Sequence, residues 1–193
     1  MWCGINIGAI IAVILIVLFF FILWMVYRRR QNQCEGHGGW YSVGARSLVA
    51  SLTGSQVIPP LRTTASGSFA GQLYPNTRQL NYLVEVVGLP LETVSSIQLH
   101  QGCDGENGPV IRTIYNRDMV SCLGNKIIED EKTNSWVIND EWSFRNNQQS
   151  CTSDIVNALL SGQVYVSVNT DCEQGGILRG QIELVNSSLI YKF

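Results

Sequence analysis

The chain has 193 residues, of which 15% are charged, and a formal net charge of −2 at pH 7. All fifteen acidic residues follow Arg30, together with ten of the thirteen basic ones, so the part after Arg30 carries 10 − 15 = −5. Nucleic-acid binding requires a positively charged surface, and this balance therefore excludes nucleic acid as a partner.

The first thirty residues predict a transmembrane anchor. Residues 8–27 read GAIIAVILIVLFFFILWMVY without a charge, and Arg28, Arg29 and Arg30 follow at once. Twenty helical residues span about 30 Å, the thickness of the hydrocarbon core of a bilayer. Trp24 and Tyr27 stand beside the arginines, where aromatic rings and cations meet the lipid headgroups. We predict that residues 1–30 anchor the protein in a lipid bilayer, with these five side chains at the membrane interface.

Two alternatives to the anchor fit less well. A cleaved signal peptide begins with basic residues and ends at a small-residue cleavage site, whereas residues 1–7 contain no Lys or Arg and arginines follow the apolar run. A buried core helix rarely needs twenty consecutive apolar residues. Because cations follow the helix and none precedes it, we expect a translocated N-terminus and residues 31–193 on the cytosolic side, a translocated domain being the alternative.

The remaining chain predicts an all-β domain behind a polar, Gly-rich linker at residues 31–45. Residues 66–73 and 80–87 alternate around a Pro-Asn-Thr turn, as in a β-hairpin. Ser153 and Asp154 can cap a short helix that ends at Leu160, with Gly162 just beyond it. About eight short antiparallel strands with one helix predict a β-sandwich. The other expected strands are residues 46–53, 94–100, 110–115, 164–168 and 177–185.

Two stretches have less regular patterns. Residues 116–150 are polar and Asn-rich, and we expect irregular loops with one or two short strands there. Trp136 and Trp142 are the expected anchors of this segment, on the domain surface or in its core. Residues 186–193 form a partly apolar tail that can pack on the domain or on a neighbour.

Six cysteines are present, and four of them lie in the domain. Cys3 and Cys34 flank the predicted helix on opposite sides of the membrane. The other four, which allow three pairings, show no C-x-x-C spacing, so a zinc site is not expected. Disulfides normally indicate an oxidising compartment, in conflict with the predicted cytosolic side. The four are Cys103, Cys122, Cys151 and Cys172.

Separated motifs over residues 46–185 resemble the CHRD domain, the repeat found in chordin. The opening one is Leu52-Thr53-Gly54-Ser55-Gln56 with Pro59-Pro60 and Thr63-Thr64-Ala65-Ser66-Gly67. The later ones, in the same order as in the family, are Leu99-His100-Gln101-Gly102, Asn107-Gly108-Pro109-Val110, Leu159-Leu160-Ser161-Gly162, Tyr165-Val166-Ser167-Val168 and Gly175-Gly176-Ile177-Leu178-Arg179-Gly180-Gln181.

The resemblance implies an antiparallel Greek-key β-sandwich, similar in architecture to Cu/Zn superoxide dismutase and without an established catalytic activity. It marks residues 116–150 as an insertion with Cys122 and Cys151 at its ends. It also places the loops that hold Cys103 and Cys172 close together. The disulfides that it implies are Cys103–Cys172 and Cys122–Cys151.

The histidines argue against metal chemistry. The family often has His-x-His where this chain has Gln98-Leu99-His100, and a histidine where it has Asn169. Dismutase-type metal sites need several imidazoles, so we expect His100 to be a hydrogen-bonding residue at a strand end. His37 lies in the linker. We predict no catalytic residue, no metal, no cofactor and no small-molecule substrate.

These features favour a non-catalytic, membrane-anchored structural protein whose domain binds other proteins. On the internal membrane of a large DNA virus, the cytosolic face is turned towards the capsid, so a minor capsid protein that tethers membrane to shell is one such role. A cell-surface or envelope binding module is the alternative, with the sequon Asn186-Ser187-Ser188 open to glycosylation. A dismutase-like metal oxidoreductase is the third and is disfavoured by the missing histidines.

Overall fold

The computed structural model describes residues 17–22, 24, 44–119, 126–143, 153–173 and 175–185. The chain forms two units, residues 1–35 and 36–193. In the first unit, residues 17–22 and 24 are helical and exposed, and Trp24 packs on Phe21 with ring centroids 5.9 Å apart. Among the described residues, no helix combines the length and the apolar character needed to cross a bilayer. The rest of the predicted anchor and most of the linker lie outside the described residues.

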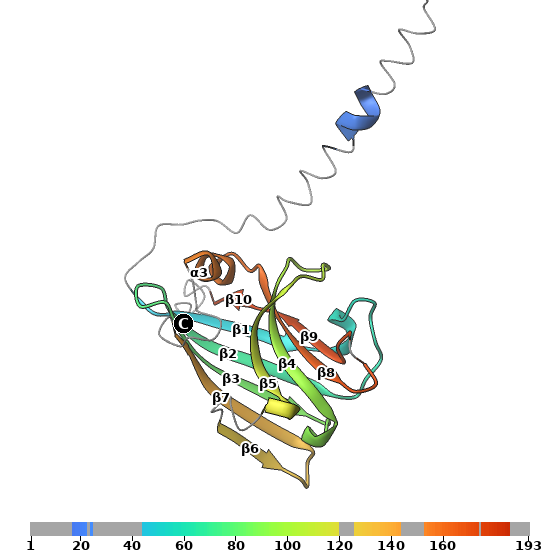
Figure 1. The fold of residues 1–193 in the computed structure, drawn as a ribbon, viewed down its shortest axis with the longest axis vertical. Coiled ribbons are helices and arrows are strands. Elements are labelled where there is room, and N and C mark those ends of the chain that lie inside the picture. The colour runs from blue at the N-terminus through green and yellow to red at the C-terminus, as the bar shows by residue number, and fades with distance from the viewer. Residues whose placement is uncertain are drawn as a thin grey trace, which may run out of the picture. The chain divides into compact units, whose positions relative to one another are not determined.

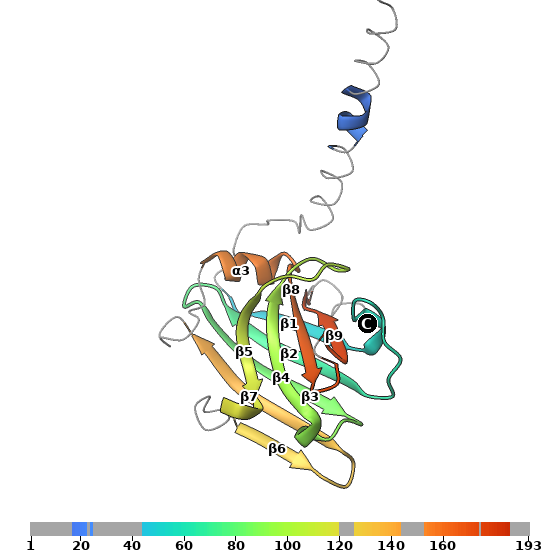
Figure 2. The same cartoon turned by 45° about the vertical axis from the view of Figure 1, so that its right-hand side comes forward.

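The second unit is an antiparallel sandwich of two sheets (Figures 1 and 2). The six-stranded sheet has the order β10-β1-β2-β3-β7-β6, and the four-stranded sheet has the order β5-β4-β8-β9. In chain order, the strands are β1 (Arg46–Leu52), β2 (Ser66–Tyr74), β3 (Gln79–Val87), β4 (Val94–Gln101), β5 (Val110–Asn116), β6 (Lys126–Asp130), β7 (Ser135–Ser143), β8 (Val164–Thr170), β9 (Leu178–Gln181) and β10 (Glu183–Leu184). The predicted all-β sandwich is confirmed.

Short helices complete the unit. The helix α3 (Ser153–Leu160) precedes β8, and Gly162 follows it with φ +68°, as the sequence predicted. Within the described ranges of this unit, three 3-10 turns that the sequence did not predict lie between strands. They are η1 (Gly54–Gln56), η2 (Leu91–Thr93) and η3 (Arg117–Met119).

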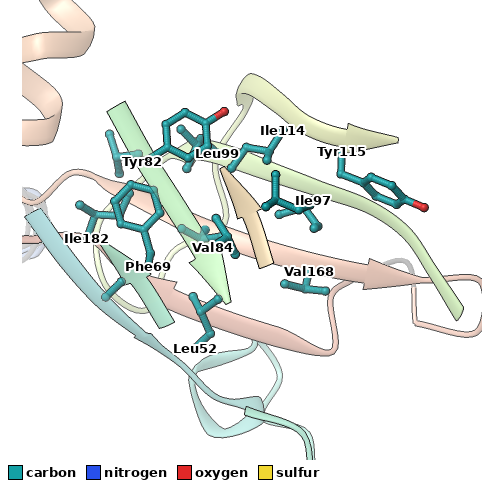
Figure 3. Packing of buried hydrophobic residues seen from close by; sticks show 14 of the residues in the cluster. Leu52, Phe69, Tyr82, Val84, Ile97, Leu99, Ile114, Tyr115, Val168 and Ile182 are labelled. Atoms are coloured by element: carbon teal, nitrogen blue, oxygen red, sulfur yellow. The ribbon is translucent and has the colours of Figure 1, made fainter. Parts of the chain in front are cut away.

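Alternation of apolar residues builds the core. In β2 and β3 every second side chain is buried, and the two strands pair from Ser66↔Val87 to Tyr74↔Gln79. Their inward side chains meet those of β4 and β8 between the sheets (Figure 3). Phe69 stacks on Tyr82 with ring centroids 5.8 Å apart. The period-2 pattern predicted this hairpin correctly, because one face of each strand packs against the core and the other face is exposed to solvent.

Two predictions about strands need correction. Residues 116–150 were expected to form irregular loops with one or two short strands. Strands β6 and β7 lie there, but β7 is not short, because its nine residues pair with β3 from Gln79↔Ser143 to Val87↔Ser135. Its inward row includes Asp140, a charged residue that breaks the apolar alternation on which the prediction relied. Residues 177–185 were expected to form one strand. They divide at the buried Ile182 into β9, which pairs with β8, and β10, which pairs with β1.

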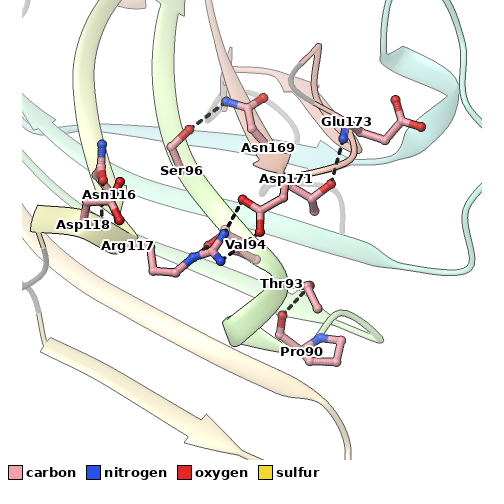
Figure 4. Close-up of polar contacts among 11 residues, drawn as sticks. Pro90, Thr93, Val94, Ser96, Asn116, Arg117, Asp118, Asn169, Asp171 and Glu173 are labelled. Carbon is pink, nitrogen blue, oxygen red and sulfur yellow. Dashed lines mark hydrogen bonds and ion pairs between the residues drawn. The ribbon is translucent and has the colours of Figure 1, made fainter.

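A bidentate ion pair ties the end of β5 to the loop after β8. The Arg117 guanidinium donates to both carboxylate oxygens of Asp171, at 2.9 and 2.7 Å, and its Nε donates to the Val94 carbonyl at 3.2 Å (Figure 4). Asp171 lowers the cost of keeping Arg117 charged, so the pKa of Arg117 is raised and that of Asp171 is lowered. Both side chains are exposed to solvent, so water screens this pair.

Candidate functional site

The polar outer face of the four-stranded sheet is where the family resemblance places its potential imidazoles. In β8, Val164, Val166 and Val168 point into the core, so Tyr165, Ser167 and Asn169 lie on the opposite face. The register pairs Tyr165 with His100 and Ser167 with Gln98 on β4. Although they point away from the core, Tyr165, Ser167 and Asn169 are only 3–7% exposed.

A network of neutral side chains occupies two of the potential imidazole positions. The amide of Asn169 donates to Ser96 Oγ at 3.0 Å (Figure 4). It also donates to Gln98 Oε1 at 3.3 Å. Ser167 Oγ donates to Asn169 Oδ1 at 2.9 Å. These amides and hydroxyls bond to one another, so they offer no set of basic ligands to a metal. Among the described residues there is also no group of three or more His, Cys, Asp and Glu side chains that could hold a metal ion.

His100 is a hydrogen-bonding residue in the covered face, as predicted. Its Nδ1 lies 2.9 Å from the Gly108 carbonyl, and a carbonyl only accepts, so Nδ1 carries the proton. Its ring stacks on Tyr165 with centroids 4.9 Å apart and an interplanar angle of 9°. Burial lowers the pKa of His100 against the opposing effect of the Gly108 carbonyl. His100 is therefore neutral at pH 7.

The lowered pKa of His100 predicts a loss of stability in acid. Because the folded state favours the neutral imidazole, its stabilising contribution is present above the unfolded pKa of about 6.5 and is lost as the pH falls through the folded value. We expect the urea midpoint of the full chain to fall between pH 7.5 and 5, and His100→Phe to reduce that fall. An equal fall in His100→Phe and in the wild type would contradict this assignment.

Arg179 holds the Gly-rich loop at residues 102–109 over this face. It is 3% exposed, and its guanidinium lies 3.7 Å from the centre of the Tyr165 ring. It donates to Asn107 Oδ1 at 3.1 Å and to the carbonyls of Cys103 and Glu106 at 3.1 and 2.8 Å. Burial lowers the pKa of Arg179, against the opposing effects of Tyr165 and Asp104. The arginine of the Gly-Gly-Ile-Leu-Arg-Gly-Gln motif thus has a loop-binding role that sequence reasoning did not assign.

Two neighbours of Arg179 in the same motif, Gln181 and Gly180, bind the adjacent loops and allow close packing on β1. The Gln181 amide donates to the Gly102 carbonyl at 3.0 Å and to the Gly162 carbonyl at 2.6 Å. A Cβ on Gly180 would lie 2.5 Å from both Ser51 O and Leu52 Cδ2 on β1. Only a glycine lets β9 approach β1 this closely, where the bridge Thr53↔Arg179 connects the two sheets.

We therefore expect the Gly180→Ala variant to be much less stable than the wild type. The added methyl meets backbone on one side and a buried leucine on the other, and overpacking of this kind costs about 1–3 kcal/mol. Gly175→Ala in the same motif is the matched control, because a Cβ there meets nothing within 4 Å. Urea unfolding of the full chain measures both, and equal midpoints would show that β9 can move away from β1.

The implied disulfide Cys103–Cys172 is wrong. Cys103 is disulfide-bonded, whereas Cys172 is a free, exposed thiol, so the partner of Cys103 is another cysteine. The two cysteines are far apart because of the strand direction. Cys103 follows β4 and Cys172 follows β8, and these neighbouring strands are antiparallel. Their following loops lie at opposite ends of the sheet. Cys122 and Cys151, the other implied pair, lie outside the described residues, as do Tyr27, Arg28, Arg29, Arg30, His37 and Asn186.

This geometry defines a class of protein: an antiparallel β-sandwich in which the polar outer face of one sheet is bonded to its own covering loop. The CHRD domain model matches residues 48–182. The chain belongs to the CHRD domain family, whose β-sandwich fits a non-catalytic interaction role. No curated protein and no solved structure is significantly similar to the chain.

Proposed function

We propose that the protein is a non-catalytic, membrane-anchored structural protein whose CHRD sandwich binds other proteins. The observation that carries this proposal is the bond between Asn169 and Gln98, at two of the positions where the family often has histidines. The third position, His100, is buried and bonded to the Gly108 carbonyl. Chemistry of the dismutase type needs basic ligands at these positions, so the proposal excludes it.

The anchor is proposed from the uncharged residues 8–27 and from the exposure of their described part. The large apolar side chains at residues 17–22 and at Trp24 are 50–63% exposed. A contiguous apolar surface of this kind is costly in water and indicates contact with lipid or with another protein. Lipid fits this run best, because Arg28, Arg29 and Arg30 end it, as headgroup-facing residues do.

We place the sandwich on the cytosolic side of the membrane. Arg28, Arg29 and Arg30 favour this orientation, because positively charged residues beside a transmembrane helix tend to stay in the cytosol. On the internal membrane of a large DNA virus this side faces the capsid shell, and there the protein would serve as a minor capsid protein that binds the bilayer through its helix and shell proteins through its sandwich. The acidic balance of the domain supports protein partners over nucleic acid.

A cell-surface or envelope binding module is the second candidate. The disulfide at Cys103 favours it, because disulfides persist in oxidising compartments. In that case the domain is translocated, and the sequon at Asn186 can carry a glycan.

Protease treatment of sealed membranes with their cytosolic face outward separates the two candidates. If the domain is cytosolic, residues 31–193 should be digested. If the domain is translocated, these residues should be protected, and a glycan should add a mass that the Asn186→Gln variant lacks. Extraction with carbonate tests the anchor itself. Phe20→Arg should release the protein into the soluble fraction, because an arginine at the helix centre costs about 2.5–3.5 kcal/mol on insertion. Gln31→Arg, outside the apolar run, is the control and should stay with the membrane like the wild type. Release of the wild type by carbonate, or retention of Phe20→Arg in the membrane, would contradict the anchor.

A further inference from the structure

We propose that the outer face of the six-stranded sheet around Val49, with the acidic cavity beside it, binds a basic protein segment. A lysine or arginine side chain of the partner enters the cavity, and an apolar side chain next to it enters a shallow hollow on the sheet. This inference rests on the proposed interaction function and names the surface and the chemistry of the partner. It does not depend on the membrane anchor.

The cavity arises where the chain crosses from one sheet to the other. At Ile182 the backbone leaves β9 for β10, so β1 pairs with β10 only at Leu48 and Val49 and meets β9 again at Thr53. A cavity of about 460 Å³ lies along the unpaired part of β1. Its lining residues are Val49, Ala50, Ser51, Gln56, Asp104, Gln181 and Glu183.

The backbone at the bottom of this gap is already bonded to a side chain. Gln56 Nε2 donates to the Ser51 carbonyl at 3.0 Å, and Gln56 Oε1 accepts from the Gln181 N–H at 3.2 Å. Gln56 thus replaces the missing ladder bonds between β1 and β9. A partner strand is therefore not needed to complete this sheet, and the groups left for a ligand are side chains.

The groups left in the cavity are hydrogen-bond acceptors. Asp104 and Glu183 are exposed, and within the described part of the chain neither forms an ion pair. Gln181 Oε1 is buried and is therefore not open to a ligand in the cavity. Lysine and arginine side chains carry donors only, so a cationic side chain in the cavity can pair with the carboxylates of Asp104 and Glu183 that line it.

A hollow of about 300 Å³ adjoins the cavity on the same sheet, and both are lined by Val49, which is 45% exposed. The outward side chains at the hollow are uncharged and mostly small. Ala70 and Leu83 lie next to Val49 in one row across β1, β2 and β3. The remaining lining residues are Ser47, Leu48, Gly71, Gln72, Asn81, Tyr82 and Asn139.

Charge selects the partner of this surface. The charged residues at the outward positions of β1, β2, β3 and β7 are Glu85 and Glu141, and Glu183 lies on β10 at the edge. A second copy placed face to face would bring these like charges together, and phosphates of nucleic acids or anionic lipids would be repelled. A protein segment that alternates basic and apolar residues matches both the acidic cavity and the uncharged hollow.

Peptide binding to the full chain in detergent micelles tests the proposal. The probe is a fluorescein-labelled peptide Ser-Lys-Val-Lys-Val-Lys-Ser, and the reference is the same peptide with Glu in place of Lys. In fluorescence anisotropy, we expect binding of the lysine peptide and none of the glutamate peptide. The affinity for the lysine peptide should fall as the salt concentration increases. Glu183→Gln and Ala70→Trp, which remove the charge and fill the hollow, should each weaken binding about fivefold or more, as losses near 1 kcal/mol do.

Glu92→Gln, an exposed carboxylate on η2, is the matched control and should leave the affinity unchanged. Unchanged affinity in Glu183→Gln and Ala70→Trp, with circular dichroism like that of the wild type, would overturn the proposal. So would stoichiometric Ca²⁺ binding that Glu183→Gln abolishes and Ala70→Trp does not, since it would assign the cavity to a metal. Peptide binding that appears only after deletion of residues 186–193 would assign the surface to the chain's own C-terminal segment. None of these outcomes depends on the membrane anchor, which carbonate extraction tests separately.

Discussion

Trp136→Ala is expected to lower the free energy of unfolding by about 3–5 kcal/mol, the cost of truncating a buried tryptophan. Trp136 lies on β7 and is 1% exposed. Its Nε1 donates to the Leu89 carbonyl at 2.8 Å and thereby ties β7 to the loop after β3. Urea unfolding of the full chain in detergent, followed by circular dichroism, measures the loss.

A second variant separates the packing of Trp136 from its hydrogen bond. Trp136→Phe keeps most of the apolar volume but leaves the buried Leu89 carbonyl without its donor, which costs about 1–3 kcal/mol. Ile128→Ala on the neighbouring β6 is the control, because Ile128 is 60% exposed and surface changes usually stay within about 0.5 kcal/mol. If Trp136→Ala costs no more than Ile128→Ala, β7 is not part of the core.

Asp140→Ala is expected to cost about 3–5 kcal/mol, because removing one partner of a buried ion pair leaves the other charge uncompensated. Asp140 Oδ2 lies 3.0 Å from Arg112 Nη2 and accepts from Tyr82 Oη at 2.8 Å. The side chains of Arg112 and Asp140 are 8% and 14% exposed. The pair links β5 of the four-stranded sheet to β7 of the six-stranded sheet, so its loss affects the contact between the two sheets.

Tyr82 keeps its proton in this network. Burial, followed by the negative charge of Asp140, raises the pKa of Tyr82 far above its usual range, so the phenol remains a donor to the carboxylate at pH 7. Tyr82→Phe should therefore cost less than Asp140→Ala, since it removes one donor and leaves the ion pair in place.

The exposed pair Arg117–Asp171 is the matched control for the buried one. Asp171→Ala removes a carboxylate with equally short contacts, and water screens its loss, so a much smaller effect is expected. The double variant Arg112→Met with Asp140→Leu should recover most of the stability that Asp140→Ala loses. Equal losses for Asp140→Ala and Asp171→Ala would contradict a buried role for Asp140.

Local patterns were sufficient to predict most of the sandwich. The alternation in residues 66–73 and 80–87 predicted β2 and β3, because inward residues of an antiparallel pair must be apolar while the outward face is wet. Asp154 near the start and Gly162 beyond the end predicted α3, since caps and a left-handed glycine are local requirements of a helix. The separated motifs predicted the CHRD family, which the match over residues 48–182 confirms.

The predictions that failed depended on contacts between distant residues. Asp140 concealed the full length of β7, where only short strands were expected, because its partner Arg112 lies 28 residues away in the sequence. The division of residues 177–185 at Ile182 depends on two different neighbours, β8 and β1, competing for one segment. The pairing of cysteines depends on the ends of strands, and the antiparallel order of β4 and β8 separates Cys103 from Cys172.

The sequence by itself determined the class of fold and the family, because periodicity, turn residues and short motifs are local properties. The anchor at residues 1–30 stays a prediction from the length of its apolar run. Only the tertiary structure decided what the motif residues do. It placed Arg179 on Tyr165 beneath the Gly-rich loop, and it bonded Asn169 to Gln98 across β8 and β4. Such roles follow from which strands become neighbours, and that choice is set by the packing of the whole core rather than by any one segment.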